Sequence, residues 1–362
     1  MLGAIVGDIV GSRFEFDNHR DKEFELFGNG VGYTDDSICT IAVADALLKG
    51  KSYAASLQEW CRRYPNPIGS YGGGFARWIK EDNPQPYGSY GNGSAMRVSA
   101  CGWLAERDEV LAEARKSAEC THNHPEGIKG AEATALAIWM LRSGYSKGDL
   151  RDTITKQFGY NLNMTCDELR KTYQFDPSCQ GTVPQAFVCF LESESFEDTI
   201  RLAISIGGDS DTLAAIAGSV AEAYYGIPNE IAAKALTYLP NEMISVIEEF
   251  TARYGDSLEP LINQCRYYDG RDLFPEDPKY MLRWQFEYLW VHSTSVQCEK
   301  VVKHYKEAGL ADLEPNDGVP MSLKAVLYKG FVQSGNRVCP EGETPQSCFR
   351  SWYRNSYMHD AL

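Results

Sequence analysis

The sequence predicts an all-α protein. Apolar residues recur with helical spacing, and in the stretch 213–224 they fall at i, i+3, i+4, i+7, i+8 and i+11 and so line one helix face. Stretches of this kind follow one another from Gly148 to Tyr254, with breaks at Asp176–Pro177, Gly226–Pro228 and Pro240. The alternating polar and apolar pattern of strands is scarce. The 362 residues suffice for one large domain or two moderate ones.

Composition restricts the partners and the compartment. The formal net charge of −15 argues against nucleic acid or a membrane surface bound by general electrostatics. The eleven cysteines form no Cys-x-x-Cys pair and no zinc spacing, which favours free thiols and a reducing cytoplasm. No apolar run reaches transmembrane length, and the first eight residues lack the basic region of a signal peptide. We therefore expect a cytoplasmic protein with no membrane partner.

Residues 3–12 are predicted to form a helix of mainly small and apolar residues. Gly3, Gly7 and Gly11 are spaced by four and leave a groove along one face. Each glycine costs a helix roughly 1 kcal/mol relative to alanine, so close packing against another helix should offset that cost. Glu15 follows just beyond the predicted end, where a lone glutamate is usually a surface residue.

Two predicted helices begin with the same kind of acidic cluster. The first cluster precedes the apolar stretch 38–48 and the second precedes 213–224; their side chains are Thr34, Asp35 and Asp36, and Asp209, Asp211 and Thr212. Helix capping is the simplest interpretation, because carboxylates and hydroxyls bind the free N–H groups there. The same oxygens are the ligands that Mg²⁺ prefers. If the fold brings both clusters together, four carboxylates would repel one another unless cations lay between them, which favours a two-metal centre.

Two further stretches offer polar groups for a ligand. The segment Ser89–Ser94 is rich in glycine and precedes a predicted helix at 98–104, so its N–H groups have the setting of a phosphate site. A tight structural turn is the commoner explanation, and the pattern is no dinucleotide fingerprint. His122 and His124 precede Pro125, but a zinc site would need a third ligand at suitable spacing. A hydrogen-bonding or structural role is therefore favoured for these histidines.

In combination, these motifs resemble the ADP-ribosylglycohydrolase family, which includes the dinitrogenase reductase-activating glycohydrolases. The matching motifs are Gly7-Asp8-x-x-Gly11-x-x-x-Glu15, Thr34-Asp35-Asp36, Gly91–Arg97, Thr121-His122 and Gly207–Thr212, in the family's order, across about residues 1 to 260. The resemblance implies a compact helical globule with two Mg²⁺ or Mn²⁺ ions at the floor of an ADP-ribose cleft.

The same resemblance implies roles for individual residues. The metal ligands would be Thr34, Asp35, Asp36, Asp209, Asp211 and Thr212. Glu15 matches the family's mobile acid near the scissile bond, and the catalytic carboxylates would be Glu15, Asp36, Asp35 and Asp209, which would orient water and move protons. The diphosphate and the adjoining ribose would lie against Ser89, Tyr90, Gly91, Asn92, Gly93 and Ser94, with His122 as a further contact.

The expected reaction is metal-dependent hydrolysis of an ADP-ribosyl glycosidic bond. ADP-ribose would leave a modified protein side chain, arginine first, or a small molecule. The metals would hold the distal ribose hydroxyls and lower the pKa of a bound water, and the bond at C1″ would break with oxocarbenium character. One alternative is a non-catalytic metal-dependent ADP-ribose-binding protein or a crystallin-like structural protein. Another is a nucleotide-sugar transferase with Asp209-x-Asp211 as its metal motif, although that chemistry is more usual on an α/β sheet.

The resemblance divides the chain into two parts. Residues 1–263 would form the catalytic domain, and residues 264–362 would form a mainly helical C-terminal extension of unknown role. In the extension we expect a helix at 280–305, a linker at 315–318 and a short helix at 322–328.

Overall fold

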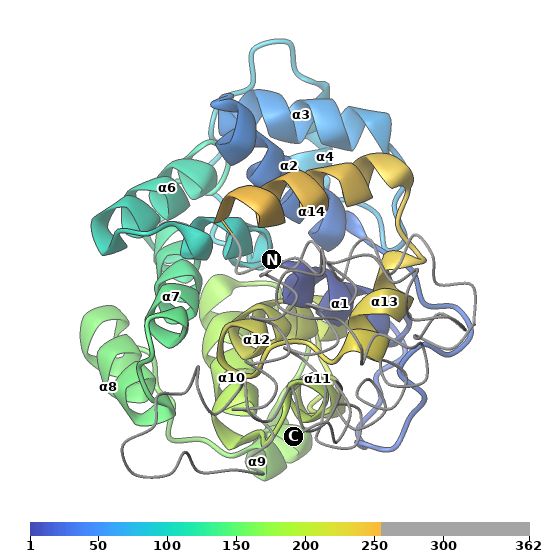
Figure 1. Ribbon diagram of the computed structural model, residues 1–362, viewed down its shortest axis with the longest axis vertical. Coiled ribbons are helices and arrows are strands. Elements are labelled where there is room, and N and C mark those ends of the chain that lie inside the picture. Colours follow the sequence, from blue (N-terminus) through green and yellow to red (C-terminus); the bar gives the residue numbers. More distant parts are fainter. Residues whose placement is uncertain (255–362) are drawn as a thin grey trace, which may run out of the picture. The chain divides into compact units, whose positions relative to one another are not determined.

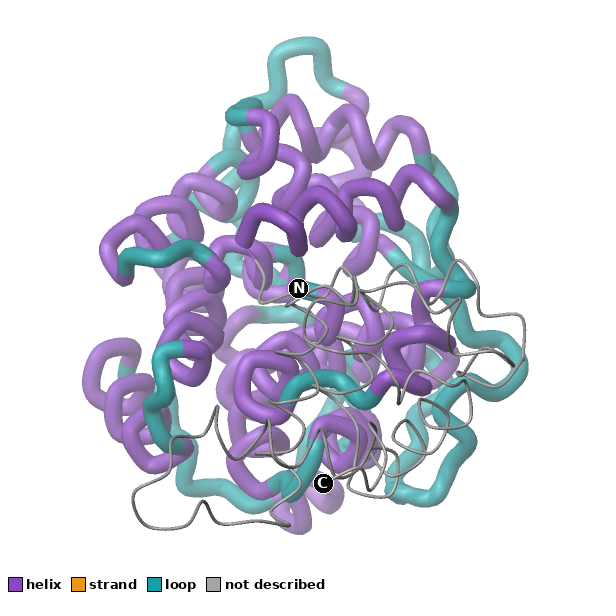
Figure 2. Tube along the Cα trace, in the orientation of Figure 1, coloured by secondary structure: helices purple, strands orange, loops and turns teal. Residues whose placement is uncertain are grey.

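All of the regular secondary structure in residues 1–254, the part of the chain that this computed structural model describes, is helical (Figure 2). The α-helices are α1 (Leu2–Gly11), α2 (Asp35–Lys49), α3 (Tyr53–Arg63), α4 (Gly73–Lys80), α5 (Gly93–Met96), α6 (Arg107–Glu119), α7 (Pro125–Arg142), α8 (Lys147–Phe158), α9 (Cys166–Thr172), α10 (Cys179–Glu192), α11 (Phe196–Ser205), α12 (Ser210–Tyr225), α13 (Asn229–Leu236) and α14 (Asn241–Tyr254), and the 3-10 helices are η1 (Ser12–Phe14) and η2 (Val98–Trp103). The prediction of an all-α fold is confirmed.

The most extensive helix contact in the described residues joins α1 to α12, and the glycines of α1 make it possible. A Cβ atom on Gly3 would lie 2.3 Å from the carbonyl oxygen of Gly218, and one on Gly7 would lie 2.0 Å from that of Ala214. Because successive glycines of α1 contact progressively earlier residues of α12, the two helices are antiparallel. The contact confirms that another helix packs into the predicted groove, and no larger residue would fit at either glycine.

Six further α-helices contact this pair, namely α2, α5, α7, α10, α11 and α13. Helices α11 and α10 pack against α12, and α2 packs between α3 and α14 (Figure 1). Residues on all sides of α1 and α12 are buried, including Ile5, Ile9, Leu213 and Ile216, none of which is exposed. Helices that are apolar all round belong in the core, which explains why both stretches show so few polar residues.

The predicted helix bounds agree with the structure to within a few residues at most positions. The stretch 98–104 differs, because it forms the 3-10 helix η2 rather than an α-helix. No helix in residues 1–254 is both long enough and apolar enough to cross a bilayer. The predicted domain boundary at residue 263 and every predicted element of residues 264–362 lie outside the described residues, so they stay predictions.

Candidate active site

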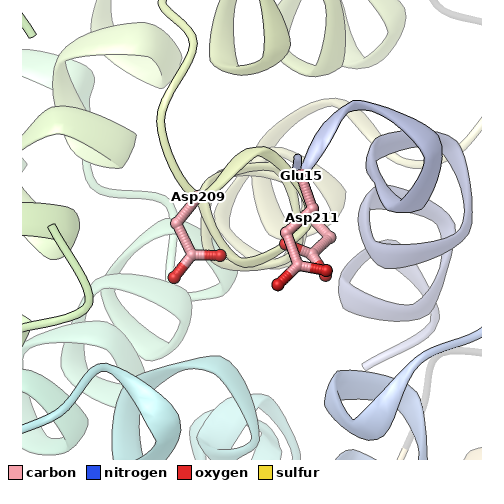
Figure 3. Close-up of side chains that lie close together, drawn as sticks. All are labelled: Glu15, Asp209 and Asp211. Carbon is pink, nitrogen blue, oxygen red and sulfur yellow. The ribbon is translucent and has the colours of Figure 1, made fainter. Parts of the chain in front are cut away.

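The antiparallel packing of α1 and α12 brings Glu15 to the acidic start of α12. The end of α1 contacts the start of α12, where a Cβ on Gly11 would lie 2.6 Å from the Cα of Asp211. Glu15 follows η1, one turn beyond that contact. Carboxylate oxygens of Glu15, Asp209 and Asp211 all lie within 4.8 Å of one another, and Figure 3 shows the side chains directed to one common space. Two segments nearly 200 residues apart in the sequence therefore form one acidic cluster.

The start of α2 faces the same cavity. This cavity has a volume of about 680 Å³, and both acidic helix starts contribute to its lining. The predicted site residues that line it are Glu15, Asp35, Asp36, Ser89, Tyr90, Gly91, Asn92, Gly93, His122, Asp209, Asp211 and Thr212. Thr34 and Ser94 are fully buried beside it and are absent from the lining. The fold thus brings the two acidic clusters together, as the sequence-based argument for a shared site requires.

Asp8 holds the start of α2 in place, a role that the sequence did not reveal. Its carboxylate accepts hydrogen bonds from the backbone N–H groups of Thr34 and Ser37, each at 3.0 Å, and from both of their hydroxyls. Thr34 in turn accepts from the N–H of Asp36 at 3.1 Å and caps the helix. An acid inside the small-residue helix α1 was the available signal, but its partners lie 26 and 29 residues away.

Burial raises the pKa of five carboxyl groups that line the cavity, those of Glu15, Asp35, Asp36, Asp209 and Asp211. Burial is the largest cause in each case, and neighbouring carboxylates add to it for Asp35, Asp36 and Asp211, whose pKa values lie well above the usual range. The pKa of Glu15 is raised to about 7 by burial and then by the charges of Asp209 and Asp8. Such shifts cluster where proteins hold cations or move protons.

The donor set fits a divalent cation. The Asp36 Oδ2 oxygen is buried without a hydrogen-bond partner, which is costly for a carboxylate unless another group neutralises it. With the carboxylates of Glu15, Asp209 and Asp211, it provides the hard oxygen ligands that Mg²⁺ and Mn²⁺ take. The histidine alternative is not supported in the described residues: His122 lines the cavity, whereas His124 accepts from the N–H of Glu126 and caps α7.

The glycine-rich segment forms another part of the cavity wall, beside Asp209. Asn92 donates from Nδ2 to Asp209 at 2.7 Å and to Thr182 at 3.1 Å, so its amide orients one of the acids. The N–H of Gly91 donates to the Ser89 hydroxyl and that of Asn92 donates to the carbonyl of Pro177. Those two N–H groups therefore already have acceptors within the protein.

Comparison with known proteins identifies the family. The profile of the family described as ADP-ribosylglycohydrolase matches residues 1–269. The chain belongs to the ADP-ribosylglycohydrolase family. A solved structure described as an ADP-ribosylglycohydrolase-related protein complex has the same fold, with a TM-score of 0.54 and 23% identity over 70% of this chain and 97% of that chain.

Three curated relatives of the chain are ADP-ribosyl hydrolases by name, and two of the names state a substrate. ADP-ribosylhydrolase ARH3 of Homo sapiens is 26% identical, with 63% of this chain and 84% of the relative covered. ADP-ribosylarginine hydrolase Tri1 of Pseudomonas putida is 25% identical, with 63% and 70% covered. ADP-ribosyl-[dinitrogen reductase] glycohydrolase of Rhodospirillum rubrum is 25% identical, with 62% and 84% covered.

Several cavity residues were not singled out from the sequence. Tyr71, Phe75 and Tyr87 line the cavity, and Phe175 lies on its lining with 48% of its surface exposed. No local motif marks them, because isolated aromatic residues are common in any helical protein. Asn18, which lies outside the lining, contacts the backbone of Glu15.

Proposed function

We propose that this protein cleaves an ADP-ribosyl glycosidic bond by metal-dependent hydrolysis and releases ADP-ribose. The observation that supports this proposal best is the convergence of Asp35, Asp36, Asp209 and Asp211 with Glu15 on one cavity. At about 680 Å³, the cavity falls within the range that small-molecule sites occupy.

The acidic residues and the glycine-rich segment of the cavity wall suggest how the substrate is oriented. The distal ribose would lie at the acidic side, and the diphosphate would lie along Ser89–Ser94. Since Gly91 and Asn92 already use their N–H groups, a backbone contact to phosphate would fall to Gly93, which lines the cavity, rather than to the fully buried Ser94. Tyr90 is 52% exposed on the cavity lining, and its ring, with that of Phe175, offers a stacking surface for adenine.

The acidic side would hold two Mg²⁺ or Mn²⁺ ions. Asp35, Asp36, Asp209, Asp211 and Thr212 would be their ligands, and Thr34, whose hydroxyl donates to Asp8, would be a sixth. When bound, the ions would bind ribose hydroxyls and lower the pKa of a water molecule.

The protein's own carboxyl groups would orient the water and move protons. With a pKa raised to about 7, Glu15 holds or releases a proton near neutral pH, as a general acid or base must. Asp36, Asp35 and Asp209 would position the attacking water. The leaving group departs from C1″ as positive charge develops on the ribose, and the surrounding carboxylates stabilise that charge.

The substrate we propose first is a protein modified on arginine, with a small ADP-ribosyl compound as the second possibility. An arginine hydrolase among the relatives supports this order. The site of action we propose is the cytoplasm, and neither nucleic acid nor membrane is needed as a partner.

Comparison of linkages tests the proposal. The full chain would be incubated with ADP-ribosyl-arginine and ADP-ribosyl-serine peptides in the presence of Mg²⁺ or Mn²⁺, and free ADP-ribose would be measured by chromatography. We expect release from the arginine peptide at the higher rate. Release from neither peptide, with tight binding of ADP-ribose, would favour the non-catalytic binding protein instead.

A further inference from the structure

Arg97 is a buried cation without a carboxylate partner in the described part of the chain. Its side chain follows α5, is 1% exposed and contributes to the cavity lining. The Nη2 atom donates to the carbonyl of Ser117 at 2.7 Å and to the hydroxyl of Thr121 at 2.8 Å, and Nε has no partner. Burial of a guanidinium without a counter-ion costs free energy. The position of Arg97 at the cavity wall therefore requires a compensating interaction.

Thr121 connects Arg97 to His122. The Thr121 hydroxyl oxygen lies 2.7 Å from His122 Nδ1, and Arg97 donates to that same oxygen. The hydroxyl hydrogen has two acceptors within reach, the carbonyl of Ala118 at 3.5 Å and His122 Nδ1 at 2.7 Å. The shorter contact is much the better hydrogen bond, so Thr121 donates to Nδ1. In a neutral imidazole the remaining hydrogen then lies on Nε2.

The Nε2 atom of His122 faces the loop of Gly91 and Gly93. It lies 3.1 Å from the position that a Cβ on Gly93 would take and 3.6 Å from that of a Cβ on Gly91. Burial and then the charge of Arg97 hold the pKa of His122 well below 6.5, so the ring is neutral at physiological pH. A neutral imidazole carries a single N–H. Whether that hydrogen lies on Nδ1 or on Nε2 decides whether Nε2 can donate a hydrogen bond.

We propose that Arg97 acts through Thr121 to fix His122 as an Nε2–H donor for the diphosphate of the ligand. Arg97 and Thr121 are positioning residues: they orient the ring and add a positive charge behind it. The negative charge of the diphosphate would compensate for the unpaired guanidinium. The identity of the ligand rests on the proposed function, whereas the tautomer of His122 does not.

The tautomer can be measured in the unmutated protein. Long-range proton–nitrogen correlation spectra of the protein labelled with ¹⁵N-histidine distinguish the two neutral forms. His122, one of six histidines, would be assigned by comparison with His122→Gln. We expect the Nε2–H form without ligand. A hydrogen on Nδ1, or a doubly protonated ring at pH 7, would overturn the proposal whether or not any variant folds.

Substitution of Thr121 tests the connection to the ligand. Thr121→Val keeps the shape and removes the hydroxyl, whereas Thr121→Ser keeps the hydroxyl. Thr199→Val is the matched control, because Thr199 is equally buried, hydrogen-bonds to Ser193 and Ser195, and lies outside the cavity lining. Affinities for ADP and for adenosine would be measured by calorimetry.

We expect Thr121→Val to weaken ADP binding roughly tenfold, with Thr121→Ser and Thr199→Val close to the unmutated protein. Adenosine binding should not change, because it lacks the diphosphate. Equal losses for ADP and adenosine, or unchanged ADP binding in Thr121→Val, would overturn the proposal. Failure of the unmutated protein to bind ADP would overturn the ligand assignment. If ADP binds as expected but no ADP-ribosyl bond is cleaved, the proposed function fails and this inference stands.

Discussion

Asn18 and Gly208 exchange two hydrogen bonds across 190 residues of sequence. Asn18 Nδ2 donates to the Gly208 carbonyl at 2.9 Å, and Asn18 Oδ1 accepts from the Gly208 N–H at 2.7 Å. The same Nδ2 group donates to the carbonyl of Glu15 at 3.1 Å. Because Gly208 immediately precedes Asp209, one side-chain amide links the backbones of two carboxylates in the candidate site.

Asn18→Ala should therefore impair catalysis more than stability. Asn18 is exposed, so loss of its hydrogen bonds should lower the free energy of unfolding by only about 1 kcal/mol. Misplacement of a catalytic group costs far more, and we expect kcat to fall roughly 10- to 100-fold. Urea unfolding and steady-state kinetics measure the two effects, with exposed Asn163→Ala as the control. A normal kcat in Asn18→Ala would show that the link does not position Glu15.

Replacement of Asp8 should mainly lower the free energy of unfolding. In Asp8→Ala, the buried N–H groups of Thr34 and Ser37 lose their acceptor, and we expect a loss of about 2 to 4 kcal/mol in unfolding free energy. Asp8→Asn retains an acceptor oxygen and should recover part of that loss. Asp17→Ala, at an exposed acid nearby, should change the free energy by less than about 0.5 kcal/mol. If urea unfolding gives Asp8→Ala the same small change in unfolding free energy as Asp17→Ala, Asp8 does not hold the start of α2 in place.

The raised pKa values predict how pH affects the metal-free protein. Burial raises the pKa of Asp35, Asp36 and Asp211 well above the usual range, that of Glu15 to about 7 and that of Asp8 to about 6. Between about pH 4 and pH 7 the folded state then binds more protons than the unfolded state. Stability is therefore greatest below the unfolded pKa values and is lost as pH rises through the folded ones.

Melting temperatures in chelator should accordingly fall from pH 5 to pH 8. Excess Mg²⁺ or Mn²⁺ should raise the melting temperature, and the increase should be largest near pH 8. Cations favour the charged carboxylates and bind only the folded state. A melting temperature that depends on neither pH nor metal would contradict the shared acidic site.

Asp211→Asn separates metal binding from helix capping. Two unit charges ~4 Å apart repel by ~4 kcal/mol at an effective dielectric constant of about 20, so removal of one charge should stabilise the chelated protein. The variant should lose activity, and its melting temperature should respond less to metal than that of the unmutated protein. A simple capping role predicts a loss of about 1 kcal/mol, with the same response to metal in both proteins.

The sequence predicts elements more completely than it predicts their partners. The spacing of Gly3, Gly7 and Gly11 indicates a close helix contact, yet nothing in α1 specifies that α12 is the partner. The paired acidic clusters favour a shared metal site only if the fold brings them together, because helix capping explains each cluster by itself.

The contacts of the positioning residues could not be predicted from local sequence patterns. Asn18 reaches Gly208 across 190 positions, and Arg97 reaches Thr121 across 24. An asparagine in a polar loop has no local pattern that distinguishes it from a surface residue. Arg97 ends the Gly91–Arg97 motif, but nothing in that motif shows that its side chain reaches Thr121. Their importance depends on tertiary contacts that only the folded chain makes.

Release of ADP-ribose from an ADP-ribosyl-arginine peptide, measured as a function of metal concentration, tests whether the acidic cluster is a catalytic metal site. The full chain would be stripped with chelator, dialysed and titrated with Mg²⁺ or Mn²⁺, with Asp211→Asn measured in parallel. We predict no release without metal, release that saturates as metal is added, and none from Asp211→Asn at the same concentrations. Equal release with and without chelator, or full activity in Asp211→Asn, would contradict this prediction.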